Sequence, residues 1–196
     1  AITGRVVVGQ QMTVKEFYRS AKATQHDDYT ARLEFLLRGS PKMRAMLPII
    51  RDQVIVYSEK AIIWAMYPAE QVYIAAVLCE VGIDCRVLHG GIDADDREQI
   101  ISDFTTERTK CMVLICSYGV NSAGLNLQTL CRNVHLFSPA LSKATRDQAI
   151  GRTCRLGQDR IVLVYDYSVD ESFNEYMLSR TKNKAIASLM IEATSF

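Results

Sequence analysis

From residue 54 onward the chain repeats one pattern, in which most short apolar runs are followed by a longer helical stretch. Mostly apolar runs of four to six residues are typical of strands buried on both faces of a parallel sheet. Helices between such strands act as right-handed crossovers. The pattern predicts an α/β fold, an open three-layer α/β/α sandwich with a mainly parallel sheet. The runs are Val54–Tyr57, Ala61–Met66, Cys85–Leu88, Cys111–Cys116, Val134–Phe137 and Ile161–Tyr165.

The same pattern divides the chain into three parts. Residues 1–40 are an N-terminal extension, partly helical, with a short strand at Val6–Val8; residues 41–170 carry the sheet; residues 171–196 form a C-terminal helix. Ser172 and Glu175 have the spacing of a capping box at the start of that last helix. Helices are predicted at 14–19, 29–37, 68–81 (closed by Gly82), from an N-cap at Asp93, at about 144–156, and from 172 toward 190.

Composition excludes several classes of protein. The chain has 196 residues, 23 Lys+Arg against 22 Asp+Glu, a net charge of +1, and 48% apolar residues. A disordered chain has low hydrophobicity and high net charge, which this chain does not have. A net charge this small also argues against wholesale electrostatic binding to nucleic acid. No apolar run approaches the roughly 20 residues of a membrane span, so no membrane partner is expected. The absence of an initiating Met and of a secretory signal suggests an intracellular fragment.

The six cysteines are expected to be reduced thiols rather than disulfides or metal ligands. None forms a Cys-x-x-Cys pair, and most lie inside apolar stretches. They are Cys79, Cys85, Cys111, Cys116, Cys131 and Cys154.

The stretch Gln148–Gln158 is the strongest candidate for chemistry. On a helix Gln148, Arg152 and Arg155 share one face, while Ile150 and Cys154 point toward the sheet. Residues 132–160 hold six basic and two acidic residues, a local charge of +4. Two guanidiniums on one face suit a polyanion such as a triphosphate. The alternative is a solvated basic face that makes surface ion pairs.

Two loops that follow predicted strands could hold phosphates. Ser117–Leu127 is rich in small and turn-forming residues whose backbone N–H groups can cradle phosphate oxygens. His89-Gly90-Gly91 allows close approach of a backbone or phosphate. Ordinary turn geometry explains either loop equally simply. Because ligands of open α/β sheets bind beyond the carboxyl ends of the strands, the loops of interest are 89–93, 117–126, 138–143 and 166–171.

Some chemistries are missing from the sequence. It holds no Gly-x-x-x-x-Gly-Lys-Ser/Thr phosphate loop. The three histidines, His26, His89 and His135, have no metal-ligand spacing, and no metal site is predicted. Asp170-Glu171 is attributed to helix capping rather than to magnesium binding.

Together these stretches resemble the C-terminal RecA-like lobe of a superfamily-two helicase, and more narrowly the Swi/Snf-like chromatin-remodelling ATPases. Gln148–Gln158 matches the sixth motif of that family, Gln-x-x-x-Arg-x-x-Arg-x-Gly-Gln, and Ser117–Leu127 matches both ends of the fifth. The resemblance covers about residues 40–177, roughly two-thirds of the chain. Further matches are Ser40–Arg44 with Leu47, Ala61–Met66, and Leu88–Gly91 with Arg97 and Phe104.

The chain departs from the family pattern in three places. Val120–Ser122 replaces the usual Ala-Gly-Gly of the fifth motif, Tyr118 replaces a usual Thr, and Cys154 a common His. These changes bear on DNA contact and coupling, whereas both arginines and Gly157-Gln158 are intact. DEAD-box RNA helicases end the related motif in Gly-Arg.

The resemblance implies the second lobe of a DNA-dependent ATPase and DNA translocase, with ATP and Mg²⁺ bound between this lobe and a first RecA-like lobe that holds the magnesium. Arg155 is implied as an arginine finger with Arg152 in support. Without the first lobe no hydrolysis is expected. The implied ATP-binding residues are Gln148, Gly124, Asn126, Arg152 and Arg155, and the implied DNA-binding residues are Ser117, Tyr118, His89, Gly90 and Gly91.

The implied partners are the first lobe, double-stranded DNA including nucleosomes, and a protein bound at residues 1–40. The implied location is the nucleus in a eukaryote and the cytoplasm otherwise. Two further alternatives are a non-catalytic scaffold that keeps the lobe's fold, favoured by the altered fifth motif, and the lobe of an RNA helicase. A Rossmann-type enzyme is disfavoured because Gly-x-Gly-x-x-Gly is absent.

Overall fold

The fold is built around one five-stranded sheet in which every strand is parallel to its neighbours. A computed structural model describes residues 5–8, 10–13, 28–119, 125–173, 175–181 and 183. Within them the spatial strand order is β4-β5-β3-β6-β7. The predicted α/β sandwich with a parallel sheet is therefore confirmed. The strands are β3 (Lys60–Ala65), β4 (Cys85–Leu88), β5 (Val113–Ser117), β6 (Cys131–Leu136) and β7 (Leu163–Asp166).

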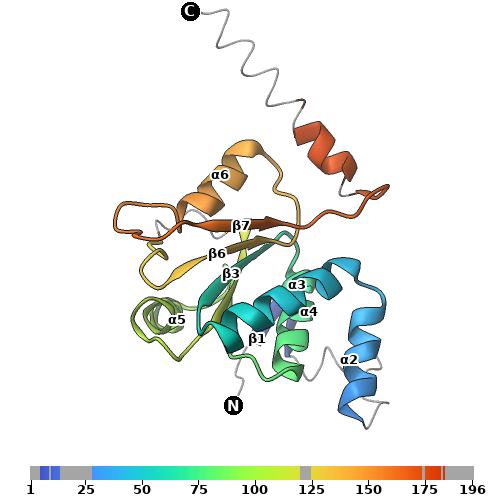
Figure 1. Ribbon diagram of the computed structural model, residues 1–196, viewed down its shortest axis with the longest axis horizontal. Helices are drawn as coiled ribbons and strands as arrows, with labels where there is room; N and C mark the ends of the chain where they lie inside the picture. The colour runs from blue at the N-terminus through green and yellow to red at the C-terminus, as the bar shows by residue number, and fades with distance from the viewer. Residues whose placement is uncertain are drawn as a thin grey trace, which may run out of the picture.

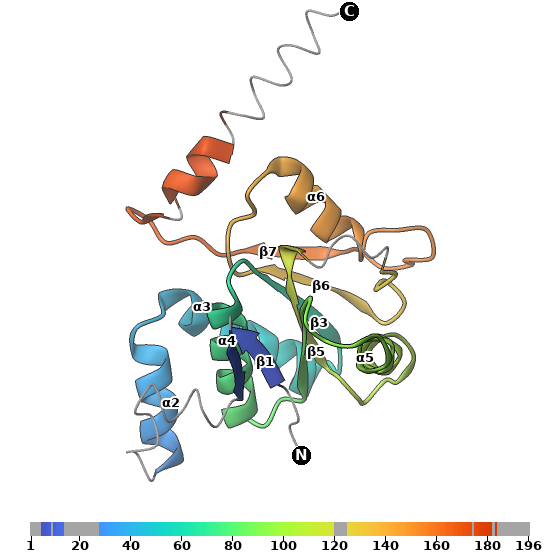
Figure 2. The same ribbon diagram turned by 180° about the vertical axis from the view of Figure 1, so that it is seen from behind.

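Helices cover both faces of the sheet. Alternate side chains of the central strand point to opposite sides, so each face presents apolar residues that a helical layer buries. Ala61, Ile63 and Ala65 pack into the core under α2 (Tyr29–Arg38), α3 (Pro41–Arg51) and α4 (Pro68–Glu80). Ile62 and Trp64 pack on the other side, under α5 (Ala94–Thr106) and α6 (Lys143–Gly151). Figures 1 and 2 show these three layers from opposite sides.

The N-terminal segment contributes an antiparallel hairpin of β1 (Arg5–Val8) and β2 (Gln10–Thr13). It confirms the strand expected at Val6–Val8, and β1 lies against α4 (Figure 2). The helix expected at 14–19 lies outside the described residues, as does the chain from 184 to 196. Residues 175–181 are helical. The Glu175 carboxylate at the start of this helix accepts from the Glu171 N–H at 2.7 Å.

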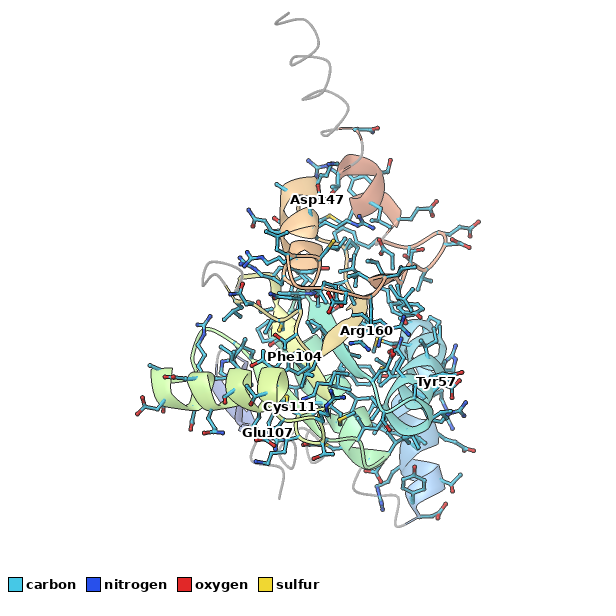
Figure 3. The ribbon with its side chains drawn as sticks, turned by 60° about the vertical axis from the view of Figure 1, so that its left-hand side comes forward. Tyr57, Phe104, Glu107, Cys111, Asp147 and Arg160 are labelled. Atoms are coloured by element: carbon cyan, nitrogen blue, oxygen red, sulfur yellow. The ribbon has the colours of Figure 1, made fainter. Side chains whose placement is uncertain are left out.

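The run Val54–Tyr57 is not a strand, so that prediction was wrong. The chain leaves α3 as a π-helix, η2 (Asp52–Val56), whose wider turn is closed by the Tyr57 N–H bonding to the Asp52 carbonyl at 2.9 Å. Ile55, Val56 and Tyr57 are exposed, and Figure 3 shows Tyr57 on the outer side of the molecule. Four apolar residues are too few to distinguish a strand from the end of a helix.

A buried lysine ties the end of α5 to the sheet. Lys60 opens β3, and its ammonium donates to the carbonyls of Asp103 at 3.0 Å and Cys111 at 3.3 Å. The same ammonium lies 5.1 Å from the centre of the Phe104 ring, and Figure 3 shows Phe104 and Cys111 side by side. Burial lowers the pKa of Lys60, and the carbonyls supply the acceptors that the buried ammonium needs.

Among the described helices, none has the length and apolar character needed to cross a membrane.

Candidate functional site

The arginine-bearing stretch forms a turn rather than a continuous helix. Ser142 caps α6 by accepting from the Thr145 N–H at 3.1 Å, but the helix ends at Gly151 instead of near Leu156. The chain then tightens, with Thr153 and Cys154 both donating to the Ile150 carbonyl at 3.0 Å. We call residues 152–158 the arginine turn. Cys154 is exposed here rather than directed at the sheet, because the helical register on which that prediction rested stops three residues earlier.

Contacts distant in sequence fix the arginine turn. The Gln158 amide donates to the carbonyls of Gln128 at 3.0 Å and Cys131 at 2.8 Å. The Leu127 N–H donates to the Arg152 carbonyl at 3.1 Å. Gly157 adopts φ +92°, a left-handed conformation that suits glycine. The turn is thereby held beside the first residue of β6.

Arg155 is the exposed member of the arginine pair. Its Nε donates to the Gly151 carbonyl at 3.1 Å, and its guanidinium also donates to the Asn126 side-chain oxygen. These two bonds use two of the five N–H donors of the guanidinium, and the side chain is exposed. An anion could reach Arg155 without displacing core side chains.

Arg152 is 9% exposed and lies close enough to Arg155 for their charges to interact. Burial, and then the charge of Arg155, lowers the pKa of Arg152. A nearby anion would relieve that repulsion, so the pair is suited to a phosphate group.

The sequence-predicted nucleotide residues are only partly brought together. Asn126, Arg152 and Arg155 form one cluster at the arginine turn. Gln148 is exposed on α6, one turn before the helix ends. Gly124 lies outside the described residues.

The arginine turn lies at the amino ends of the strands, which differs from the expectation that ligand loops gather at the carboxyl ends. Its Gln158 bonds to Cys131, where β6 begins. The physical reason is that α6 is a crossover helix, so it runs antiparallel to β6 and returns the chain to the opposite edge of the sheet (Figure 1).

The second group of predicted residues lies at the carboxyl edge. Leu88 at the end of β4 pairs with Cys116 of β5, so His89-Gly90-Gly91 and Ser117 emerge from neighbouring strand ends. Gly90 and Gly91 are exposed. His89 is 7% exposed, and its Nδ1 accepts from the Gly91 N–H at 3.1 Å, so His89 shapes the loop from within.

Tyr118, like His89, is a predicted DNA contact whose side chain is buried. It is 5% exposed, stacks on Trp64 with ring centres 5.8 Å apart, and donates its hydroxyl to the Ser138 carbonyl at 2.8 Å. Its phenol therefore anchors the start of the loop instead of meeting a surface ligand. The Ser117 hydroxyl accepts from the Gly119 N–H at 3.2 Å.

Sequence reasoning missed two supporting groups at these sites. One is the carboxyl-edge hub, in which the Glu70 carboxylate accepts from the Ser138 hydroxyl at 2.5 Å and from the N–H groups of Met66 and Tyr67 at 3.1 Å. The other is Gln128, whose carbonyl receives Gln158. The Glu70 bonds to Met66 and Tyr67 are local, but Ser138 lies 68 residues from Glu70 and Gln158 lies 30 residues from Gln128, so no local signal marks those two pairings.

The described residues contain no group of three or more His, Cys, Asp or Glu side chains able to hold a metal ion.

Comparison with known proteins identifies the family. The profile of the helicase conserved C-terminal domain matches residues 42–157, which include both edges described above. The chain belongs to the helicase C-terminal domain family. This lobe is related to the SNF2-family ATPases, as the resemblance implied.

Two curated relatives and one solved structure illustrate the relationship. The DNA repair protein RAD5 of Eremothecium gossypii is 28% identical over 144 residues, which cover 72% of this chain and 13% of that protein. The SNF2 domain-containing protein CLASSY 4 of Arabidopsis thaliana is 26% identical over 148 residues, covering 74% and 13%. The chain thus spans 13% of the length of each relative.

The solved structure is the C-terminal part of the Fun30 ATPase domain. It matches with a TM-score of 0.72 and 20% identity, covering 87% of this chain and 54% of that one. At this identity the likeness establishes the fold.

Proposed function

We propose that this lobe is the second half of a SNF2-like, DNA-dependent ATPase that translocates on double-stranded DNA, including nucleosomal DNA. The observation that carries the proposal is the exposed Arg155 guanidinium, held by Asn126 and the Gly151 carbonyl beside the buried Arg152. The family membership and the relative named for DNA repair support it. In a eukaryote such an enzyme works in the nucleus.

The lobe's contribution to hydrolysis is electrostatic. Negative charge develops on the γ-phosphoryl oxygens in the transition state, and a positioned guanidinium stabilises it. Arg155 supplies that charge, Arg152 supports it from its buried position, and Asn126 sets the direction of the Arg155 fork. Gln148 orients the nucleotide from α6, and Gly124 completes the site by analogy with the family motif. Magnesium, when bound with ATP, neutralises phosphate charge and is held by the first lobe.

In the proposed enzyme, DNA binds at the opposite, carboxyl edge of the sheet. Exposed Gly90 and Gly91 let a phosphate approach the backbone, and Ser117 lies at the neighbouring strand end. His89 and Tyr118 support this surface from below through their bonds to Gly91 and Ser138. Such backbone contacts carry little sequence information.

One chain segment reaches both edges. Ser117 ends β5 at the carboxyl edge, while Leu127 bonds to Arg152 at the amino edge. The fifth motif thus begins beside the DNA surface and ends beside the nucleotide surface. This placement gives a covalent route by which DNA contact and nucleotide state influence one another.

The first test is hydrolysis by the lobe alone. We expect the purified 196-residue chain to show no magnesium-dependent ATP turnover, because it holds no phosphate loop. Joined to its first lobe, it is expected to hydrolyse ATP faster when double-stranded DNA is added. ATP turnover by the lone chain would contradict the proposal that hydrolysis needs the first lobe. A two-lobe protein that is folded but inactive would favour the scaffold alternative.

The DNA surface is tested by placing a negative charge on it. Gly90 has no atom within 4 Å of the position a Cβ would take, so Gly90→Asp should fold normally. Repulsion from phosphate is expected to weaken DNA binding by about tenfold in Kd, measured by fluorescence anisotropy with the two-lobe protein.

Two controls accompany this variant. Gly90→Ala adds the Cβ without the charge and should bind like the wild type. Gly39→Asp adds the same charge at the end of α2, where the space is equally open. Equal weakening by both aspartates would show a general charge effect and remove Gly90 from the surface.

A further inference from the structure

The turn between α4 and β4 brings two free cysteines together. Gly82 adopts φ +73°, which lets the chain reverse sharply at the end of α4. Its N–H donates to the Cys79 carbonyl at 3.0 Å, and the Ile83 N–H donates to the Leu78 carbonyl at 2.9 Å. Cys85, the first residue of β4, is therefore returned to the last turn of α4.

The fold brings the two cysteine side chains to the same part of the core. The Cys85 thiol is 4.0 Å from the Ala75 carbonyl, which lies one helical turn before Cys79. Cys79 packs against the core cluster that contains Cys85, and each thiol influences the pKa of the other. The turn therefore places two oxidisable groups in one neighbourhood, on elements that are adjacent in the fold.

The two thiols have different surroundings. Cys79 is half-buried, whereas Cys85 is buried. The neighbouring Cys85 thiol, aided by the charge of Arg86, lowers the pKa of Cys79 against the opposing effect of burial. The neighbouring Cys79 thiol and burial raise the pKa of Cys85. Cys79 is thus the accessible nucleophile, and Cys85 is the thiol positioned to attack it next.

We propose that Cys79 and Cys85 form a reversible intrachain disulfide when the protein meets a hydroperoxide. This modification site is independent of the nucleotide and DNA surfaces. The protein is a substrate of oxidation there, with hydrogen peroxide as the simplest oxidant.

The chemistry balances in two steps. The Cys79 thiolate attacks the peroxide oxygen, an S–O bond forms, the O–O bond breaks, and hydroxide leaves. The Cys85 sulfur then attacks the Cys79 sulfur, the S–S bond forms, the S–O bond breaks, and the departing hydroxide takes the Cys85 proton as water. Two thiols lose two electrons and two protons, and one hydrogen peroxide is reduced to two waters.

The other cysteines lack this combination. Cys111, Cys116 and Cys131 are fully buried, and burial raises the pKa of each thiol. Cys154 is exposed on the arginine turn. They provide internal controls for burial and for exposure.

Tryptic peptides separate the three groups. Residues 61–86 form one peptide whose only cysteines are Cys79 and Cys85, residues 111–132 carry the three buried thiols, and residues 153–155 carry Cys154. The protein is treated with limiting hydrogen peroxide, alkylated with N-ethylmaleimide under denaturing conditions, digested and weighed by mass spectrometry. We expect peptide 61–86 to lose two hydrogens and both maleimides together, and to regain both after dithiothreitol.

Variants test the order of the steps. Cys79→Ser should leave Cys85 taking up one maleimide, and Cys85→Ser should leave a sulfenic acid at Cys79 that dimedone captures. Cys154→Ser, the matched control, should leave the disulfide unchanged. The wild-type mass readout decides the question if either variant fails to fold.

Two results would overturn the proposal. One is peptide 61–86 still taking up two maleimides when Cys154 is already oxidised. The other is Cys79 joined to Cys154 or to a second chain instead of to Cys85.

Discussion

Arg155→Ala in the two-lobe enzyme is expected to reduce the rate of ATP hydrolysis by about 10³-fold or more, the range attributed to an arginine finger. The loss belongs to the transition state, because Arg155 would meet the charge that develops on the transferred phosphoryl group. The readout is kcat for magnesium-ATP at saturating DNA.

The fold should tolerate this substitution. Arg155 is exposed, and its bonds go to the exposed Asn126 side chain and to the Gly151 carbonyl. Such bonds contribute only about 1 kcal/mol to stability, so the unfolding temperature should stay close to that of the wild type. A large loss of activity with little loss of stability is the signature of a group that acts on substrate.

Two further variants sharpen the result. Arg155→Lys keeps the charge but loses the planar fork that bonds both Asn126 and a phosphate, so it should recover only part of the rate. Arg38→Ala removes an exposed arginine at the end of α2, on the opposite face of the sheet, and should hydrolyse ATP like the wild type. Wild-type turnover by Arg155→Ala would remove this residue from the mechanism.

The sheet could be predicted from sequence because burial on both faces leaves a continuous apolar run. β3 shows this directly, since every residue from Lys60 to Ala65 is buried. The same rule failed at Val54–Tyr57, where an apolar run lies at the exposed end of a π-helix. Lys60 shows the converse, since nothing local reveals that a lysine will be buried against the carbonyls of Asp103 in α5 and of Cys111 just before β5.

The candidate site could be recognised from its residues but not from its shape. Spacing placed Arg152 and Arg155 on one helical face, yet the helix stops at Gly151 and a turn carries them. Bonds from Gln158 to Gln128 and Cys131 decide where that turn lies. These partners are about 30 residues apart, and pattern analysis of one sequence is local. The placement of the two predicted surfaces on opposite edges of the sheet could therefore emerge only from the fold.

Acidification from about pH 7 to about pH 5 is expected to cost about 2 kcal/mol of stability through one residue, His135. His135 belongs to β6, and its ring is fully buried and stacked on Tyr165 with ring centres 4.7 Å apart. Nε2 lies 2.9 Å from the Gln53 side-chain oxygen, which only accepts, so Nε2 carries the proton. Nδ1 then accepts from the Tyr167 hydroxyl at 2.8 Å.

The direction follows from where the proton binds. Burial lowers the pKa of His135 from 6.5 to about 3 in the folded protein. Between these values the unfolded chain binds a proton that the folded state does not, so the free energy of unfolding falls as pH falls. The loss of stability begins as the pH falls to about 6.5, the pKa of histidine in the unfolded chain. Glu59 contributes at lower pH than His135. Although burial opposes the shift, bonds to Arg132 and Asn133 lower the pKa of Glu59 from 4.5, so the stability that its carboxylate supplies is lost only at a pH below that at which the loss from His135 begins.

Urea denaturation at the two pH values measures the effect, and a pair of variants assigns it. His135→Gln removes the titrating ring, so its free energy of unfolding, although lower at neutral pH, should change much less between the two conditions. Tyr165→Phe keeps the stacked ring and the histidine, so the wild-type pH dependence should persist. If His135→Gln loses as much stability on acidification as the wild type, the protons are taken up elsewhere and the buried imidazole is not the acid-sensitive element of this fold.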